Sequence, residues 1–445
     1  MTDQAETASR ASMLALVAAL VRDPRLRRIF LLGVASGFPW LLIGSAMTAW
    51  LADEGLTRSA IGLFSSVLVA YTVNFLWAPL VDHLRLPGLH RLGRRRSWML
   101  LCQGAMIAFT LLLAVSGPAS SIWLTAALAL GIALASATQD LAIDAYRINI
   151  IGEDEPELIG HGAAMATCGW WTGLSLPGTF AFWLADPLGW PAVYLLLAVV
   201  IVAISVLVLV FFQEPATPPQ QVHVQPSWRE WITFTPWLDA VAEFFRRNGV
   251  ALALGLLAFI FLFKIGEAFL GRMVILFYKE VGFSDADIGT YSKGLGLLVT
   301  FACCIAAGIF AGRFGAVRGL LFAGFAMAAT NLLFSWIAVV GPDERLLSLA
   351  VIADGITSTF STVAFVTFIS YYTSRLHTAA QYGALASLGN SGRTLLAASS
   401  GMLVDGMGGD WALFFVLTAV MVLPSLGVLA WIARRVAVKV PSGSG

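Results

Sequence analysis

Charged residues are scarce in this chain of 445 residues. Asp, Glu, Lys and Arg together make up 12% of it, whereas 58% of the residues are hydrophobic. A soluble domain carries roughly 25% charged residues, so this chain cannot cover its surface with polar groups. The composition therefore excludes a soluble globular protein and a disordered one. The formal net charge of +1 also argues against a nucleic-acid-binding protein, which needs a basic excess.

Cysteine is equally rare, and its spacing shows no CxxC pair. We interpret the four cysteines as small apolar packing residues rather than as disulfide partners or metal ligands: Cys102, Cys168, Cys303 and Cys304. The chain also lacks a P-loop, an HExxH motif and a nucleophile elbow. We therefore expect no enzymatic activity, no metal and no cofactor, and energy for any transport would come from an ion gradient or a substrate gradient.

Long apolar runs, by contrast, recur along the whole chain. A membrane-spanning helix needs about 20 mostly apolar residues, and twelve segments meet this requirement within boundary errors of a few residues. The first six predicted spans are 28–51, 60–81, 97–117, 121–148, 160–185 and 190–212, and the second six are 249–278, 286–311, 318–340, 346–373, 380–404 and 411–433.

The distribution of lysine and arginine predicts the orientation of these spans. Twenty of the 27 basic residues fall on the side that also holds both termini, and three (Arg58, Lys279 and Arg345) fall on the other side. Because basic loops stay in the cytoplasm, both termini are predicted to be cytoplasmic. The remaining four basic residues fall inside predicted spans: Lys264, Arg272, Lys293 and Arg393.

The chain divides into two halves around a polar, proline-rich linker. The linker, 213–248, ends in an amphipathic piece at 237–247 that we expect to lie on the cytoplasmic membrane surface. The predicted organisation is a cytoplasmic N-terminal segment, a six-helix bundle, the linker, a second six-helix bundle and a cytoplasmic tail: 1–27, 28–212, 213–248, 249–433 and 434–445.

The two halves resemble each other in sequence. GLTRSAIG at 55–62 matches GFSDADIG at 282–289, and Trp190 matches Trp411 at the start of the last span of each half. These matches follow the same order at a nearly constant offset, which indicates a duplicated six-helix unit. Parallel six-helix repeats are the architecture of the major facilitator superfamily. The predicted fold is therefore an all-α membrane protein with twelve transmembrane helices in two bundles.

Several short motifs carry a closer resemblance. They are SGFPW at 36–40, NFLWAPLVD at 74–82, GRRR at 93–96, ATQDLAIDAYR at 137–147, FKIGEAF at 263–269, AFVTF at 364–368 and QYGALAS at 381–387. With these motifs the chain resembles the AmpG muropeptide permease family over roughly residues 25–430. Two positions depart from the family pattern: Glu267, where aspartate is more usual, and Trp170-Trp171, where a Tyr-Arg-like pair is more usual.

The resemblance implies a function as well as a fold. AmpG permeases import N-acetylglucosaminyl-1,6-anhydro-N-acetylmuramic acid and its peptides across the inner membrane, driven by protons, for peptidoglycan recycling. The expected partners are therefore protons, a sugar-peptide and the bilayer, with a monomeric protein and no nucleic acid. Two alternatives stay open: a permease for another anionic metabolite such as acetyl-coenzyme A, to whose transporters the resemblance extends, and a membrane sensor that uses a transporter fold.

Acidic residues inside the membrane are the candidate proton sites. An ionisable group among spanning helices costs at least roughly 2.5–3.5 kcal/mol at the bilayer centre, so it persists where it is paired or lines a wet cavity. Asp140 and Asp144 share one face of span 4, and their mutual repulsion would make one of them bind a proton more readily. An ion pair of Asp144 with Arg147, one turn away, is the alternative. Glu267 in span 7 is the third candidate, and Asp354 in span 10 is a further one.

Candidate substrate contacts are basic, amide and aromatic side chains at membrane depth. Lys264 would hold a substrate carboxylate, or else it neutralises Glu267 one turn away. The amides would contact a sugar or a neighbouring helix, and the aromatic rings would stack on sugar rings or pack. The predicted substrate-binding residues are Lys264, Gln139, Arg393, Lys293, Asn74, Trp170, Trp171 and Tyr71, with Trp40 as a further ring.

Charged residues at the cytoplasmic helix ends are candidate gate residues. Asp82 lies at the end of span 2, before the arginine-rich loop between spans 2 and 3, and we expect it to pair with a loop arginine. The predicted gate comprises Asp82, Arg94, Arg95 and Arg147. Ordinary positive-inside charge is the other reading of these arginines.

Overall fold

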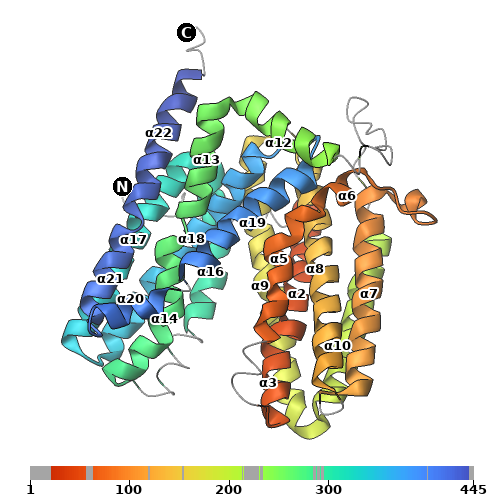
Figure 1. The fold of residues 1–445 in the computed structure, drawn as a ribbon, viewed down its shortest axis with the longest axis horizontal. Coiled ribbons are helices and arrows are strands. Elements are labelled where there is room, and N and C mark those ends of the chain that lie inside the picture. Colours follow the sequence, from red (N-terminus) through yellow and green to blue (C-terminus); the bar gives the residue numbers. More distant parts are fainter. Residues whose placement is uncertain are drawn as a thin grey trace, which may run out of the picture. The chain divides into compact units, whose positions relative to one another are not determined.

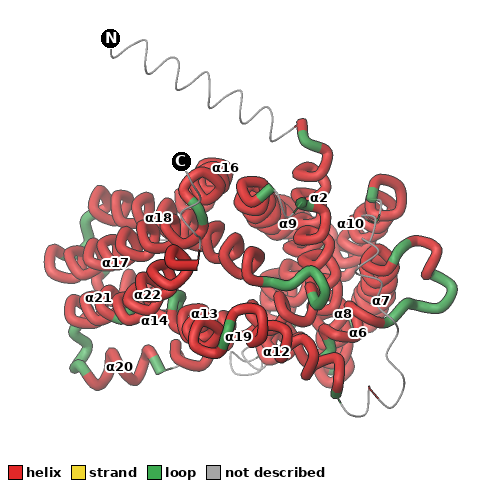
Figure 2. Tube along the Cα trace, turned by 90° about the horizontal axis from the view of Figure 1, so that it is seen from above, coloured by secondary structure: helices red, strands yellow, loops and turns green. Residues whose placement is uncertain are grey.

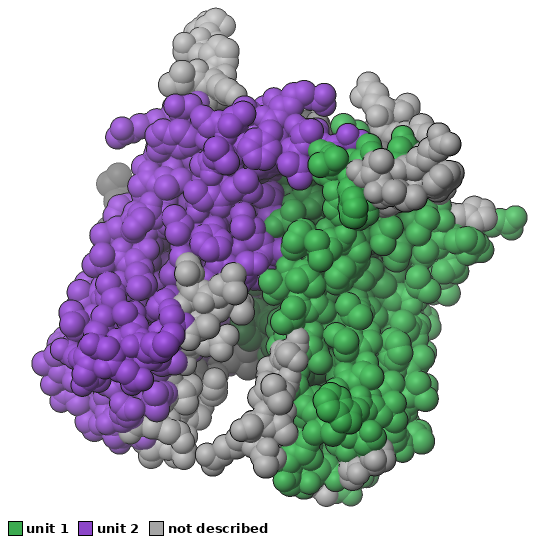
Figure 3. Space-filling model, viewed as in Figure 1, with its two compact units in different colours: residues 1–238, 373–384 green, residues 239–372, 385–445 purple. Residues whose placement is uncertain are grey.

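The structure, a computed structural model, contains helices and no strand in the part of the chain that it describes (Figure 2). That part comprises residues 22–56, 64–118, 121–152, 155–212, 214, 230, 234–283, 287, 291, 295–397 and 399–439. The chain divides into two compact units (Figure 3): unit 1 is residues 1–238 with 373–384, and unit 2 is residues 239–372 with 385–445. Each unit has its own cluster of buried apolar side chains.

Unit 1 consists of long helices and several short helical pieces (Figure 1). The long helices are α2 (Pro24–Trp40), α7 (Arg94–Ser116), α8 (Ile122–Ile150), α9 (Pro156–Leu188) and α10 (Trp190–Phe211). The shorter pieces are η1 (Leu41–Ser45), α3 (Ala46–Asp53), η2 (Ser65–Val69), α5 (Ala70–Val73), η3 (Asn74–Leu76), α6 (Ala78–His83) and η4 (His90–Leu92). Unit 1 also contains the start of α19 (Thr378–Ala397), a segment that the sequence assigned to the second bundle.

Unit 2 begins within α12 (Thr235–Asn248), which covers the segment predicted to be amphipathic. The other helices of this unit are α13 (Val250–Leu262), α14 (Ile265–Val281), α16 (Gly296–Phe314), α17 (Ala316–Val340), α18 (Glu344–Tyr372), the rest of α19, α20 (Ser400–Gly406), α21 (Trp411–Val420) and α22 (Leu423–Lys439).

Eight helical stretches in the described residues are long and apolar enough to cross a membrane. The other four predicted spans, 60–81, 160–185, 286–311 and 380–404, are the second and fifth of each half. One of them is the continuous helix α9, which is long but less apolar, and another is the series of short pieces η2, α5, η3 and α6.

Helices α2 and α9 pack with their backbones almost in contact. A Cβ atom at Gly37 would lie 2.0 Å from the Trp170 carbonyl oxygen, and one at Gly173 would lie 2.2 Å from the Val34 oxygen. Small residues spaced four apart let membrane helices approach this closely, and here Gly33 and Gly37 face Gly169 and Gly173. This close packing places Trp170 beside the middle of α2.

One side-chain interaction occurs at equivalent positions in both units. In unit 1, the indole Nε1 of Trp190 donates to a carboxylate oxygen of Asp53 at 2.6 Å. In unit 2, Nε1 of Trp411 donates to a carboxylate oxygen of Glu280 at 2.8 Å. Each pair joins the start of the last span to the end of the first span of its half, so the internal repeat extends from sequence to contacts.

Candidate functional site

Asp140 and Asp144 lie on α8 one turn apart, as their spacing predicted. The Ser36 hydroxyl on α2 donates to Oδ1 of Asp140 at 2.6 Å. Among the described residues Asp140 has no ion-pair partner, although it lies in the middle part of a membrane-spanning helix. The sequence did not identify Ser36 as a candidate. The only feature that could have indicated it is that a small polar residue interrupts an apolar run.

Asp144 does have a cationic partner. Nη2 of Arg147 lies 3.1 Å from Oδ1 of Asp144, and the Arg147 side chain is buried. The Arg147 guanidinium also lies over the ring of Tyr382, 5.2 Å from its centroid. Of the two interpretations left open by the sequence, the pairing with Arg147 is therefore present in the structure.

The two predicted amide residues contact neighbouring helices. Nδ2 of Asn74 donates to the Ala137 carbonyl at 3.5 Å, and Nε2 of Gln139 donates to the Ala35 carbonyl at 2.9 Å. Both side chains are buried. These contacts fix α8 against η3 and α2, as the helix-bonding alternative expects. A sugar contact of either amide stays a prediction.

Four aromatic rings form a continuous cluster in unit 1. The centroid of Trp40 lies 4.6 Å from that of Tyr71 and 5.8 Å from that of Trp170, and Trp170 lies 5.2 Å from Trp171. The rings meet in tilted or edge-to-face arrangements, which are favourable for aromatic pairs. The structure thus brings together three rings predicted to contact substrate and the further ring Trp40, from α2, α5 and α9.

Unit 2 contains a second charged cluster at a break in span 7. Helix α13 ends at Leu262 and α14 begins at Ile265, so Lys264 lies in the break. Its ammonium forms an ion pair with Glu267 and donates to the Thr362 hydroxyl of α18 at 3.0 Å. Asp354, also on α18, lies within electrostatic reach of both charges. The predicted pair of Lys264 and Glu267 is therefore present, although it joins the break to α14 and does not lie within one helix. Thr362 is the partner that the sequence did not reveal.

Asp82 is fully buried and connects three segments of unit 1. Its Oδ1 accepts from Nη2 of Arg95 at 2.6 Å, and its carboxylate also accepts from the backbone N–H groups of Ala379 at 3.1 Å and Ala380 at 2.8 Å. These two N–H groups belong to the first turn of α19, which has no helical partner for them. Asp82 therefore caps α19 from a distant part of the chain and pairs with Arg95, one of the loop arginines expected to meet it.

The electrostatics of Asp82 favour its charged form. Burial raises the pKa of this carboxyl group, but the Arg95 guanidinium and the N–H groups of Ala380 and Ala379 outweigh burial and hold the pKa below its ordinary value of 3.8. Both charges of the Asp82–Arg95 pair are therefore present at neutral pH.

A second carboxylate caps a helix in the same region. Glu214 accepts from the backbone N–H groups of Arg95 and Arg96 in the first turn of α7. Gly93 precedes this turn with φ of 97°, and a Cβ atom there would lie 2.4 Å from a Glu214 oxygen. Both the positive φ and the closeness of Glu214 therefore favour glycine at this position. Sequence reasoning missed Glu214, because it lies more than a hundred residues after α7 begins.

Two predicted substrate contacts have no described side chain. Lys293 falls outside the described residues. The backbone of Arg393 lies on α19, and its side chain falls outside the description.

Comparison with known proteins identifies the family. Residues 29–397 match the family described as Major Facilitator Superfamily. The anhydromuropeptide permease of Escherichia coli strain K12 is 30% identical over 418 residues, which cover 94% of this chain and 81% of that protein. A putative transporter of Rickettsia felis, AmpG 4, is 28% identical over 427 residues, covering 95% of this chain and 99% of that protein.

Solved structures show the same fold at low identity. The human organic anion transporter MFSD10 has a TM-score of 0.68 at 19% identity, covering 91% of this chain and 99% of its own. The fucose:proton symporter FucP of Escherichia coli has a TM-score of 0.68 at 12% identity, covering 92% and 97%. The predicted major facilitator fold, an all-α membrane protein of twelve helices in two bundles, is confirmed. The chain belongs to the AmpG family of the Major Facilitator Superfamily and is a multi-pass membrane transporter for a small molecule, not an enzyme.

Proposed function

We propose that this transporter imports anhydro-muropeptides for peptidoglycan recycling, in symport with protons and by alternating access. The expected setting is the bacterial inner membrane, with both termini in the cytoplasm and the protein acting as a monomer. Support for the substrate class comes from the name of the Escherichia coli relative, which is 30% identical over nearly the whole chain.

One observation supports proton coupling above the others. Asp140 is an acidic side chain at membrane depth whose described contact is a neutral hydroxyl, that of Ser36. A carboxylate without a counter-ion is costly inside a membrane, and such residues mark proton relays and substrate pathways. Asp144 and Glu267, by contrast, are paired with Arg147 and Lys264. We therefore assign Asp140 as the principal proton site, with Asp144 and Glu267 as coupled sites.

Each unit contains groups that suit a part of a muropeptide. A muropeptide combines sugar rings with peptide carboxylates. The cluster of Trp40, Tyr71, Trp170 and Trp171 offers aromatic faces on which the apolar face of a sugar can pack. Lys264 in unit 2 is a cation that can pair with a substrate carboxylate in place of Glu267.

The charged contacts at the start of α19 support a gate. Asp82 holds α19 through two N–H groups and Arg95, and Arg147 holds Tyr382 of the same helix. We propose that these contacts form in the closed cytoplasmic gate and separate when it opens. Arg94, the first residue of α7, has no ion pair among the described residues and would add positive charge beside Arg95.

Uptake into proteoliposomes tests the proposal directly. Radiolabelled anhydro-muropeptide is added with and without an inward proton gradient. Accumulation above equilibrium only with the gradient is the expected result, and unlabelled muropeptide, but not acetyl-coenzyme A, should compete. Accumulation that ignores the gradient would overturn proton coupling, and competition by acetyl-coenzyme A alone would overturn the substrate assignment.

A further inference from the structure

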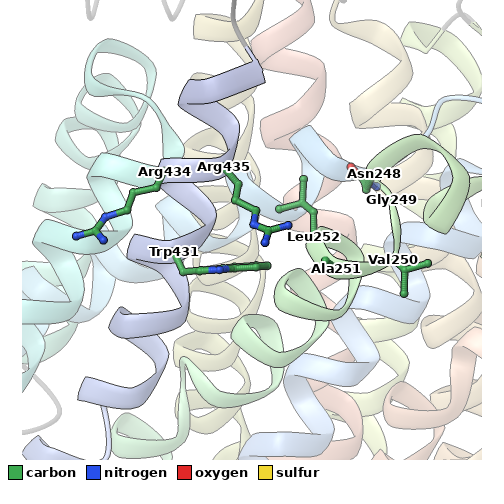
Figure 4. A pocket seen from close by; sticks show the side chains of 8 residues that line it. All are labelled: Asn248, Gly249, Val250, Ala251, Leu252, Trp431, Arg434 and Arg435. Atoms are coloured by element: carbon green, nitrogen blue, oxygen red, sulfur yellow. The ribbon is translucent and has the colours of Figure 1, made fainter.

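A pocket in unit 2 lies apart from the charged clusters described above. It has a volume of about 650 Å³ and lies between the start of α13 and the end of α22 (Figure 4). Its lining residues are Asn248, Gly249, Val250, Ala251, Leu252, Trp431, Arg434 and Arg435. Its volume falls within the range of small-molecule sites, roughly 300–1,000 Å³, and it is larger than an inorganic phosphate requires.

The pocket is positioned at a membrane boundary. One candidate span begins at Val250 and another ends at Arg435, so both helices leave the apolar layer at the pocket. Tryptophan and arginine at such a boundary are typical of the headgroup level of a bilayer. The pocket therefore lies beside lipid headgroups rather than on the path of a transported molecule.

Arg435 is held in place by aromatic packing. Its guanidinium lies 4.6 Å from the centroid of the Trp431 ring, within the range of a cation–π contact. The ring itself packs closely on α13, because a Cβ atom at Gly255 would lie 2.4 Å from the Trp431 side chain. Figure 4 shows Arg435 extending over the ring towards the first turn of α13, while Arg434 points to the other side of α22.

The two arginines give this pocket a positive charge. Within the described part of the chain, neither Arg434 nor Arg435 forms an ion pair. The first turn of α13 adds to the positive potential, because its N-cap residue, Gly249, provides no side-chain acceptor for the free N–H groups. An arginine uses several N–H donors to bind phosphate oxygens, often two at a time.

We propose that this pocket binds the headgroup of an anionic phospholipid. The phosphate lies against Arg435, and the glycerol and first acyl carbons lie against Val250, Ala251 and Leu252. These apolar side chains, together with the volume of the pocket, favour a phospholipid over a free phosphate ion. The assignment rests on the membrane position of the two helices and does not depend on which substrate the protein transports.

Native mass spectrometry of the full-length protein in detergent tests the proposal. The probes are phosphatidylglycerol and phosphatidylcholine, and the retained molecules are counted for wild type and for Arg435→Gln. Wild type should retain phosphatidylglycerol in preference to phosphatidylcholine, and Arg435→Gln should weaken this retention about fivefold, the loss expected for one basic residue near an anionic headgroup. Arg434→Gln should have a smaller effect because its side chain points away.

Control variants distinguish a specific lipid site at Arg435 from a general effect of positive charge and from a loss of folding. Arg91→Gln removes an exposed arginine of the loop before α7 and should leave retention unchanged. Arg435→Lys keeps the positive charge and should retain phosphatidylglycerol within about twofold of wild type, with an unchanged melting temperature for all four variants. Equal retention by Arg435→Gln and wild type, an equal loss in Arg91→Gln, or a loss in Arg435→Lys as large as in Arg435→Gln would each overturn the proposal.

Competition with inorganic phosphate distinguishes a lipid headgroup from a free phosphate ion as the ligand of this pocket. It carries the charge of the headgroup but lacks glycerol and acyl carbons, so millimolar phosphate should leave bound phosphatidylglycerol in place. Full displacement by inorganic phosphate would overturn the lipid assignment and identify the pocket as a site for a soluble phosphate.

Discussion

Three acidic side chains in the membrane differ in their partners. Asp144 lies beside Arg147 on α8, and Glu267 lies beside Lys264 in the break before α14, whereas Asp140 receives a hydroxyl from a different helix. An ion pair keeps a carboxylate charged, and a hydroxyl can serve either protonation state of an acid. This difference supports the proposal that Asp140 is the principal proton site.

Replacing Asp140 tests this assignment. Asp140→Asn keeps the size of the side chain and its hydrogen bond with Ser36 but cannot exchange a proton. We expect proton-driven accumulation of muropeptide in proteoliposomes to fall by about a hundredfold or more, the range typical for removal of a proton-transferring group. Exchange of internal for external substrate, which needs no net proton movement, should persist.

The matched control is Asp405→Asn, the same substitution at an exposed position on α20. It should transport as wild type does. Normal accumulation in Asp140→Asn would contradict the assignment of the proton site.

Asp82 is expected to matter for stability rather than for proton exchange. Asp82→Asn removes the negative charge that pairs with buried Arg95, and it weakens the cap of α19. Breaking a buried ion pair costs about 3–5 kcal/mol. Thermal unfolding in detergent should show this loss. Asp23→Asn, which alters a partly exposed pair with Arg25 and keeps a capping side chain, should cost less than about 1 kcal/mol.

The pH dependence of this loss follows from the lowered pKa of Asp82. A carboxyl group whose pKa is lower in the folded state stabilises the fold fully above its unfolded pKa of 3.8, and the contribution is lost as pH falls through the lower folded value. The deficit of Asp82→Asn should therefore be constant between pH 5 and 8. A deficit that disappears near pH 6 would contradict the buried ion pair.

Sequence alone identified which residues are unusual but not what they touch. Rare charges in apolar runs revealed Asp140, Asp144, Lys264 and Glu267, because each one is costly in a membrane. Their partners Ser36 and Thr362 lie 104 and 98 residues away in the chain. A hydroxyl costs little in an apolar helix, so nothing in the sequence distinguished these two from other serines and threonines.

At the level of elements, hydropathy predicted where helices lie but not where they break. The amphipathic helix α12 and most long spans could be read from periodicity and length. The break at Lys264 and the π-helical segment η1, which follows Pro39, could not. Both lie within continuous apolar runs, and their backbone geometry depends on partners from other helices.

Contact between α2 and α9 gives a prediction at this scale. Gly37→Ala would place a methyl group 2.0 Å from the Trp170 carbonyl oxygen, which forces the helices apart and separates Trp40 from Trp170. We expect a loss of about 1–3 kcal/mol in the free energy of unfolding, as for other overpacked sites, together with weaker substrate binding. Thermal unfolding and equilibrium binding of muropeptide measure the two effects.

Gly104 of α7 provides the control, because a Cβ atom there meets nothing within 4 Å. Gly104→Ala should leave stability unchanged or raise it slightly, since alanine favours the helix by about 1 kcal/mol over glycine. Equal destabilisation by both substitutions would show that glycine acts through the helix backbone and not through the contact.

For the whole molecule, the internal repeat was the most informative sequence feature. It predicted two equivalent halves, and the Trp190–Asp53 and Trp411–Glu280 pairs extend that equivalence to individual hydrogen bonds. It did not predict that residues 373–384 belong to unit 1. That assignment arises from Asp82 and other contacts within unit 1, which hydropathy does not record.

The repeated indole–carboxylate pair predicts matching effects in the two halves. Trp190→Phe and Trp411→Phe keep an aromatic ring but remove the N–H donor, so each should lower stability by about 0.5–1.5 kcal/mol, the range for a typical hydrogen bond. The double variant should show the sum, because the two sites share no contact partner. Trp183→Phe, at an exposed ring on α9, should have no effect on thermal unfolding. A clear effect in only one half would contradict the equivalence.

Asp82 occupies the position that water would otherwise take at the start of α19. If α19 leaves α6, the N–H groups of Ala379 and Ala380 and the charge of Arg95 all need new partners, and solvent must supply them. Separation of α19 from α6 therefore takes up water, so the equilibrium between the closed and the open arrangement depends on water activity. Sucrose and other osmolytes excluded from protein surfaces favour the closed arrangement, so the rate of transport is predicted to fall as their concentration rises.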